Sequence, residues 1–277
     1  MQTNPLIRNN VTVTGNTAAT TSMLFVNGLG YDQHFWQQVT PAFARDYRLI
    51  LFDHVGATPA TLEQYRIQQA RYLNISGYAT DLLEICAELA LPGEMILVGH
   101  SLGAMVGMLA AIEQPARFSK LILLGASPCY ANDRDYHGGF SKQDIDGVYD
   151  AVTQDQIVWS RQLARVAMGN RSKPALVEAF AKSLARIPQE IMLTILCAVL
   201  QGDQRQLLAR VSVPSLIIHA SQDFFVPQSV SHYLHAHLPQ SQLSAIDAEG
   251  HLPHVTAPQA VVTAMQAYLA QDPATSP

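Results

Sequence analysis

Apolar residues follow two patterns that alternate along the chain. Short apolar runs typical of buried strands occur at 23–26, 48–52, 95–98, 121–124, 213–219 and 243–246. Helical three- and four-residue spacing occurs at 76–89, 102–112, 229–237 and 258–269. Strands that alternate with helices predict right-handed crossovers and a parallel sheet. We therefore expect a doubly wound α/β core whose functional loops lie at the carboxyl ends of the strands.

Three further stretches are less regular. Residues 11–14 resemble a short edge strand, and residues 36–44 predict a short helix. Residues 55–74 are polar and irregular, and no element is predicted there. Ser76 is a candidate N-cap for the helix that follows.

The pattern changes between residues 141 and 208, where strand signals stop. Four helical stretches follow one another, at 141–154, 156–168, 173–187 and 188–201. Ser141 and Asp144 resemble a capping box, and Pro174 and Pro188 fit first-turn positions. A helical insertion between two halves of an α/β sheet predicts a lid at 128–210, with core segments at 1–127 and 211–277.

Composition limits the choice of partners and compartment. The 277 residues are 48% hydrophobic and 14% charged, which favours one α/β domain with an insertion over two small domains. The net charge of −5 and the lack of a basic run argue against nucleic acid and anionic membranes. No apolar run reaches the roughly 18 residues of a membrane span, and residues 1–10 are polar, so we expect a cytoplasmic protein. The three cysteines are widely spaced, as in reduced proteins.

One ten-residue run, 95–104, joins the strand 95–98 to the helix 102–112 through Gly99, Ser101 and Gly103. The pattern Gly-x-Ser-x-Gly at a strand-to-helix turn is a nucleophile elbow, in which the serine lies exposed at the tip of a strained turn. The two glycines leave room where the strand and the helix pass close together. Ser101 is therefore the candidate nucleophile.

A serine nucleophile needs a base that takes its proton and an acid that orients the base. In this kind of fold, the acid follows a late strand and the histidine follows the last one. Asp223 and His251 occupy those positions. His254 is a second candidate base. Asp247 is a weaker candidate acid, because it precedes His251 too closely in the chain to support it from the end of another strand.

Other polar residues are assigned more ordinary roles. His100 adjoins Ser101, but side chains that flank the nucleophile point away from it, which favours a structural role. A group on one surface helix, His232, His235 and His237, lacks a converging carboxylate or cysteine, so no metal site is predicted. The N–H groups of Leu29 and Leu102 are the candidate donors of an oxyanion hole. The loop around Leu29 is not a dinucleotide motif, because Gln33 stands where the last glycine would be, and we expect no cofactor.

Five short motifs between residues 52 and 254 carry a resemblance to a known family, and the likeness covers nearly the whole chain. They are Phe-Asp-x-Val-Gly (52–56), Gly-His-Ser-Leu-Gly (99–103), Ser-Pro-Cys-Tyr-x-Asn-Asp (127–133), Tyr-His-Gly-Gly-Phe (136–140) and Gly-His-Leu-Pro-His (250–254). Together they resemble the α/β-hydrolase family that contains the bacterial stress regulator RsbQ and the plant strigolactone and karrikin receptors.

The resemblance implies a Ser-Asp-His triad at Ser101, Asp223 and His251, a deep apolar pocket under a four-helix lid, and slow hydrolysis of a small lactone or ester. It also implies signalling through a protein partner, and it places a pocket aromatic at Trp159. The chain departs from the family in three places. Leu29 stands where phenylalanine is usual, and the residues after Gly56 lack the usual Ser-Asp pair. Three lid positions that usually carry aromatic residues are Leu163, Thr194 and Leu196.

The lid is expected to set specificity, because an inserted helical layer above the strand ends can wall a pocket over Ser101. Beside Trp159, candidate pocket residues are Tyr130, Phe140, Phe180 and Ile191. The sequence thus predicts a serine hydrolase that cleaves a small apolar ester or lactone through an acyl-enzyme. The alternative is a small-molecule sensor that signals through a protein partner, with hydrolysis slow or incidental.

Overall fold

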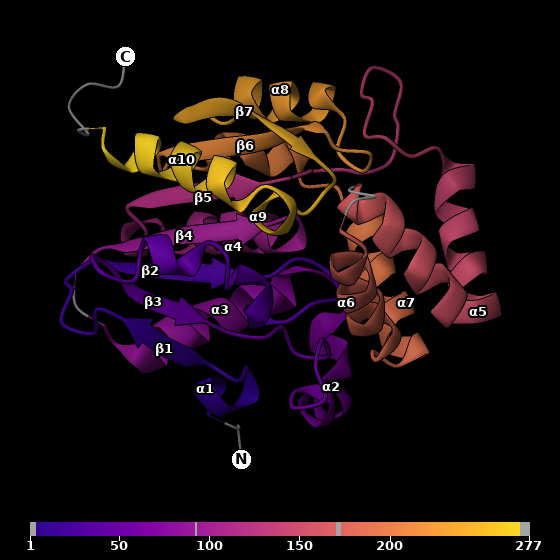
Figure 1. The fold of residues 1–277 in the computed structure, drawn as a ribbon, viewed down its shortest axis with the longest axis horizontal. Coiled ribbons are helices and arrows are strands. Elements are labelled where there is room, and N and C mark those ends of the chain that lie inside the picture. Colours follow the sequence, from indigo (N-terminus) through magenta and orange to yellow (C-terminus); the bar gives the residue numbers. More distant parts are fainter. Residues whose placement is uncertain (1–3, 92, 170–172, 272–277) are drawn as a thin grey trace.

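A seven-stranded sheet forms the centre of the molecule in the computed structural model, which describes residues 4–91, 93–169 and 173–271. One edge strand runs antiparallel to its neighbour, and all other neighbouring strands are parallel. The mostly parallel, doubly wound sheet predicted from the sequence is confirmed (Figure 1). In sheet order, the strands are β1 (Thr12–Gly15), β3 (Arg48–Leu51), β2 (Ser22–Val26), β4 (Met95–His100), β5 (Lys120–Leu124), β6 (Ser215–Gln222) and β7 (Ser241–Glu249).

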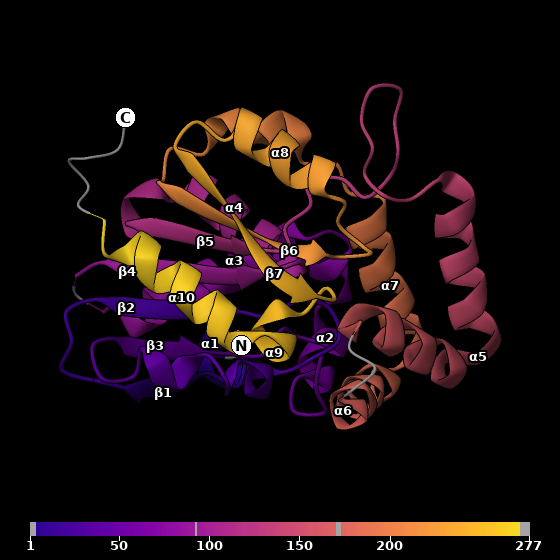
Figure 2. The ribbon, with the colours of Figure 1, turned by 45° about the horizontal axis from the view of Figure 1, so that its top comes forward.

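Side chains that alternate along the strands bury two separate hydrophobic cores, one on each face of the sheet. In β4, Leu97 belongs to one core, and Ile96 and Val98 belong to the other. The Leu97 face is covered by α3 (Ser76–Leu89), α4 (Leu102–Glu113) and α8 (Gln228–His237). The opposite face is covered by α10 (Pro258–Leu269) and by the turn that carries Trp36 (Figures 1 and 2). Burial on both faces explains why the central strands β2, β4 and β5 are mostly apolar, whereas the edge strands β1 and β7 carry polar residues.

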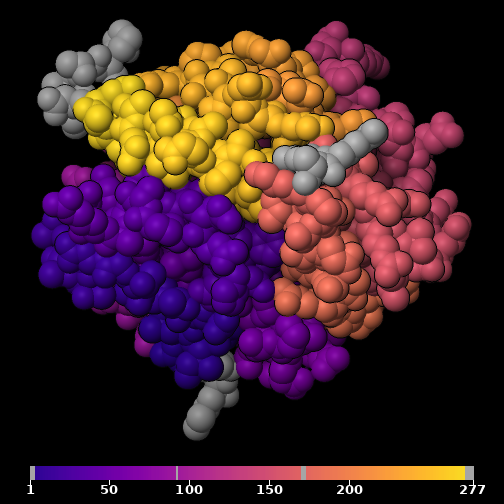
Figure 3. Space-filling model, viewed as in Figure 1, coloured from indigo at the N-terminus to yellow at the C-terminus, as the bar shows by residue number. Residues whose placement is uncertain are grey.

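The segment between β5 and β6 contains three helices that lie together beyond one end of the sheet (Figure 1). We call these helices, α5 (Lys142–Met168), α6 (Pro174–Ala185) and α7 (Gln189–Leu200), the lid helices. Two of the expected stretches form α5, which is interrupted at Asp155, where the backbone leaves helical geometry. The capping box of Ser141 and Asp144 starts this helix. In Figure 3, the lid helices lie against both the N-terminal and the C-terminal parts of the chain.

Two stretches of the chain before α3 differ from the expectation. The helix expected at 36–44 is replaced by two 3₁₀ turns, Gln33–Trp36 and Thr40–Ala42, because Pro41 has no amide hydrogen to continue a helix. The irregular stretch 55–74 contains α2 (Leu62–Ile67) and a 3₁₀ turn, Gln69–Tyr72. Tertiary packing stabilises these short elements, since the rings of Tyr65 and Tyr72 stack 5.4 Å apart.

The remaining short elements connect or close the layers. They are α1 (Pro5–Arg8), α9 (Pro253–Thr256) and the 3₁₀ turns Pro115–Arg117 and Arg205–Arg210. Ser76 is the first residue of α3 rather than its N-cap, and its N–H donates to the side chain of Asn74. None of the helices in the described residues is by itself both long and apolar enough to cross a membrane.

Candidate active site

Ser101 lies at the sharp turn between β4 and α4. Its φ of 53° and ψ of −117° are unfavourable for a residue with a side chain, so the turn stores strain. A Cβ at Gly99 would lie 2.5 Å from the carbonyl oxygen of Gly103, and a Cβ at Gly103 would overlap the backbone of Asn27 and Val26. Only glycine fits at either position, which is the steric reason for the spacing seen in the sequence.

Three side chains from the ends of three strands meet at this turn. His251, in the loop after β7, places Nε2 2.9 Å from Oγ of Ser101. Its Nδ1 lies 2.8 Å from Oδ2 of Asp223, in the loop after β6. The Asp223 side chain is fully buried, and its other oxygen accepts the N–H groups of Phe225 and Val226 at 2.9 and 3.2 Å. The structure therefore brings the three expected residues into one hydrogen-bonded chain.

The competing residues lie elsewhere or face other partners. His254 is fully buried and stacks on Trp36, with ring centroids 4.4 Å apart. Asp247 is exposed on β7, and its Oδ1 lies 3.4 Å from Oγ of Ser221. His100 points away from the Ser101 hydroxyl: its Nδ1 lies 2.7 Å from the hydroxyl of Tyr31, and its Nε2 lies 2.6 Å from the carbonyl oxygen of His251. Burial lowers the pKa of His100 well below its usual value, so the ring is neutral.

Two histidines of α8 contact neighbouring residues through Nδ1. Nδ1 of His235 is hydrogen-bonded to Ser241, and Nδ1 of His237 contacts the backbone of Tyr233. Within residues 4–91, 93–169 and 173–271, no three His, Cys, Asp or Glu side chains are grouped so that they could hold a metal ion.

The two candidate oxyanion donors flank the same space. Leu102 is the first residue of α4, where N–H groups have no partner within the helix. Leu29 follows β2 and lines the cavity that contains Ser101. In the described part of the chain, neither N–H donates a hydrogen bond to another backbone group.

A cavity of about 90 Å³ lies above Ser101 and beneath the lid helices. Four of the five predicted pocket residues line it: Trp159, Tyr130, Phe140 and Phe180. Two lid positions where the related family usually has aromatics, Leu163 and Leu196, line it too. The wall is completed by residues that the sequence did not single out: Tyr31, Val148, Ala167, Val199, Leu200, Phe225 and Leu252.

Ile191 was wrongly expected in this pocket. It packs near Gly56 and lines a separate surface depression with Tyr65 and Thr194. Because a helix turns once every 3.6 residues, Ile191 faces a different side of α7 from Leu196, which does reach the cavity.

Tyr130 contributes a contact that the sequence does not reveal. Its hydroxyl lies 3.2 Å from Oγ of Ser101, and its side chain is buried. Burial raises the pKa of Tyr130 to about 12, so the phenol keeps its proton. The motif at 127–133 and the place of Tyr130 at the start of the inserted segment predict a pocket residue, but they do not predict this contact with Ser101.

The fold and the site together define a class of protein. The family model for the α/β hydrolase fold matches residues 21–258, and the chain belongs to this family. A solved structure of a hydrolase from Oleispira antarctica agrees over 97% of both chains, with a TM-score of 0.91 and 29% identity.

The chain is also similar to curated relatives that are named for strigolactone or karrikin. A strigolactone esterase of Pisum sativum, RMS3, is 38% identical over 90% of this chain and 92% of its own. Karrikin insensitive 2 receptor CA of Petunia hybrida is 34% identical over 95% of this chain and 96% of its own. The chain therefore has relatives that are named as esterases and relatives that are named as receptors.

Proposed function

We propose that the protein is a serine hydrolase that cleaves a small apolar ester or lactone through an acyl-enzyme. The observation that carries this proposal is the hydrogen-bonded chain from Ser101 through His251 to Asp223, which opens into an apolar cavity. The membership in the hydrolase family and the esterase-named relatives support the same reaction class.

Acylation begins with the Ser101 hydroxyl. Nδ1–H of His251 donates to Asp223, so Nε2 is free to accept the Ser101 proton while Oγ forms a bond to the carbonyl carbon of the substrate. The negative charge that develops on the carbonyl oxygen is stabilised by the N–H groups of Leu29 and Leu102. When the tetrahedral intermediate collapses, the bond to the leaving oxygen breaks, and His251 donates the proton to that oxygen.

Deacylation repeats these steps with water. His251 takes a proton from the water as its oxygen attacks the acyl carbon, and the proton passes to Oγ when the bond to Ser101 breaks. Tyr130 assists at this atom: because the Ser101 hydroxyl donates to His251 in the free enzyme, the Tyr130 hydroxyl donates to Oγ. The same O–H group remains in reach of Oγ as that oxygen leaves.

The cavity limits the substrate class. None of the described residues that line it is Lys, Arg, Asp or Glu, so a charged acyl or leaving group would lose its hydration without compensation. A volume of about 90 Å³ also favours a small ligand.

The second candidate is a sensor in which ligand binding alters a protein contact and hydrolysis is incidental. It is supported by the relatives that are named as receptors. The partner proposed in that case is a signalling protein.

Turnover of p-nitrophenyl acetate tests both candidates. We expect repeated turnover by the wild type and loss of nearly all activity in Ser101→Ala, with the melting temperature little changed. Ser160→Ala is a matched control, because it removes the hydroxyl of another buried serine that does not line the cavity. Activity that survives in Ser101→Ala would refute the nucleophile, whereas one equivalent of p-nitrophenol followed by arrest would favour the sensor.

A further inference from the structure

The loop after β2, residues 27–32, carries the Leu29 N–H and is fixed firmly to the core on one side. The Asn27 side chain is buried; its Nδ2 donates to the carbonyl oxygen of Phe52, and its Oδ1 accepts from Nε1 of Trp36, both at 2.8 Å. Farther along the loop, the Tyr31 hydroxyl is hydrogen-bonded to His100. The start of the loop is therefore set by core contacts.

The other side of this loop faces lid helix α6. Gly30 has a φ of +85°, and a Cβ there would overlap the side chain of Leu184. The Phe180 ring packs edge-on against Tyr31, with centroids 6.2 Å apart. Helix α6 therefore packs directly on the loop backbone, so a shift of the helix also displaces the loop.

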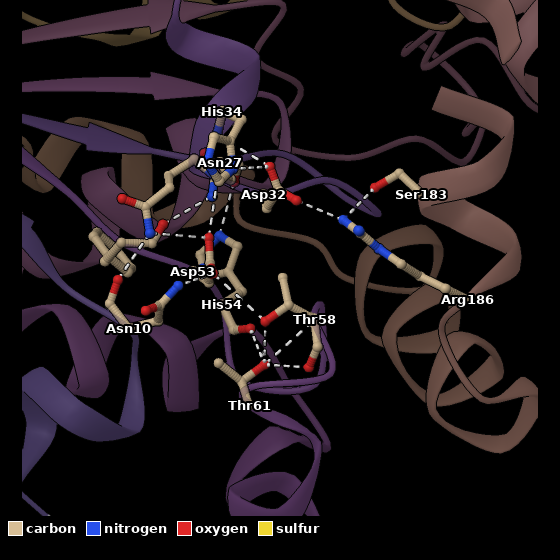
Figure 4. Close-up of polar contacts among 12 residues, drawn as sticks. Asn10, Asn27, Asp32, His34, Asp53, His54, Thr58, Thr61, Ser183 and Arg186 are labelled. Carbon is tan, nitrogen blue, oxygen red and sulfur yellow. Dashed lines mark hydrogen bonds and ion pairs between the residues drawn. The ribbon is translucent and has the colours of Figure 1, made fainter. Parts of the chain in front are cut away.

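An ion pair joins this helix to the end of the loop. Arg186, at the C-terminal end of α6, donates to Oδ2 of Asp32 at 2.6 Å and to the hydroxyl of Ser183 at 3.1 Å. The other oxygen of Asp32 accepts the His34 N–H at 3.0 Å (Figure 4). Asp32 thereby caps the 3₁₀ turn Gln33–Trp36, which follows the loop. Asp32 is thus shared between the lid and the loop.

The charge on Asp32 is maintained by these partners. Burial by itself would raise the pKa of Asp32, but the hydrogen bonds from Arg186 and His34 outweigh it and hold the pKa below its usual value. The Asp32 side chain is 16% exposed and that of Arg186 is 38% exposed, so the pair lies at the solvent-facing rim of the lid.

We propose that Arg186 and Asp32 form a latch that holds helix α6 on the 27–32 loop and so positions the Leu29 N–H toward the developing oxyanion. This inference rests on the proposed function, and both residues are positioning residues. They are 154 positions apart in the chain, so the latch closes only when the lid is seated on the core.

The latch should affect catalysis more than stability. Ion pairs this close to solvent contribute little to folding, but an oxyanion donor must be placed within a fraction of an ångström. Since loss of a whole donor costs a hundredfold or more in kcat, a loosened donor should cost about tenfold. The Michaelis constant should change by less than about twofold, because the donor acts mainly in the transition state.

The experiment is a double-mutant cycle with ester turnover as the readout. Arg186→Met keeps the aliphatic stem and removes the guanidinium, and Asp32→Asn keeps an acceptor for the His34 N–H. We expect each single variant to lose about tenfold in kcat, the double variant to lose no more, and Arg186→Lys to recover most of the loss. Lys182→Gln is the matched control, because it breaks the pair with Glu178 on the same helix and away from the loop.

Two further measurements separate positioning from mere packing. A boronic acid forms a tetrahedral adduct with the serine, so its inhibition constant should rise in Arg186→Met in proportion to the loss of kcat. Hydrogen exchange of the amides at 27–36 should also speed up in this variant, while exchange at 95–105 stays constant.

The outcomes distinguish this inference from the proposed function. Wild-type kcat and exchange in Arg186→Met would overturn the latch, even if Ser101→Ala is inactive. A raised KM with an unchanged kcat would overturn it too, because the pair would then act only on substrate entry. If the wild type hydrolyses no ester, the proposed function fails, and the exchange data decide the latch alone: faster exchange supports it and unchanged exchange refutes it.

Discussion

His254 should make the protein sensitive to mild acid. The side chain is fully buried against Trp36 and His100, and neither ring nitrogen has a hydrogen-bond partner among the described residues. Burial, reinforced by the nearby His251, lowers the pKa of His254 to about 3. The folded protein therefore keeps this ring neutral at a pH where the unfolded chain takes up a proton.

The size of the effect follows from linkage. With an unfolded pKa of about 6.5, the proton that only the unfolded chain binds costs about 2 kcal/mol of stability between pH 7 and pH 5. The loss begins as the pH falls through the unfolded pKa and levels off only near the folded pKa of about 3. Burial also lowers the pKa of His54, to about 4, and that of His100. His254 and His54 together cost about 4 kcal/mol by pH 5, and the lowered pKa of His100 acts in the same direction. This is a large part of the 5 to 15 kcal/mol typical of a domain.

Urea denaturation at pH 7 and pH 5, followed by circular dichroism, measures this difference. His254→Phe keeps a flat ring beside Trp36 and removes the titration, so it should lose about 2 kcal/mol less than the wild type between the two values. Any cost of fitting the larger ring cancels, because it is present at both pH values. His232→Gln, which changes an exposed histidine on α8, is the control and should behave as the wild type. Equal pH dependence in His254→Phe and the wild type would refute the reasoning.

The remaining predictions concern the acid and the pocket. Asp223→Asn should lower kcat on the order of 10³- to 10⁴-fold because His251 loses its correct tautomer, whereas Asp247→Asn should retain most activity; the reverse order in p-nitrophenyl acetate assays would move the acid. Trp159→Ala should enlarge the cavity and shift kcat/KM from acetate toward octanoate esters, while Ile191→Ala should cost about 2 to 5 kcal/mol of stability and leave the chain-length profile unchanged.

The sequence predicts best where one local cause determines the structure. The central strands β2, β4 and β5 are mostly apolar because both of their faces are buried. Gly99 and Gly103 are needed because no larger residue fits beside the turn. Asp223 and His251 could be placed because parallel strands bring their carboxyl ends to one edge. These predictions need no knowledge of how distant side chains pack.

Predictions fail where tertiary contacts decide between equal local choices. Helix α7 is apolar on two sides, one facing the cavity and one facing Tyr65, and nothing in its own sequence tells which side carries Ile191. The contact of Tyr130 with Ser101 depends on the irregular chain that follows β5. The pairing of Asp32 with Arg186 depends on how the lid docks, which no local pattern encodes.

Docking of the lid also bears on the choice between turnover and sensing. The proposed Ser101–His251–Asp223 machinery is needed by an esterase and by a receptor that modifies its ligand, so these residues do not separate the two. A product formed in the cavity must leave past the lid helices that wall it, and lid opening limits the turnover of many enzymes. Two contacts join the lid to the core near the site. Arg186 of the lid binds Asp32 beside the loop that carries Leu29. The carbonyl oxygen of Ala167 in the lid accepts the N–H of His251 at 2.6 Å. The strength of such ties sets how long the lid stays closed on a ligand, and a long closure is what a sensor requires. We therefore expect esterases and receptors on this fold to differ in the contacts between lid and core more than in the residues that carry out the chemistry.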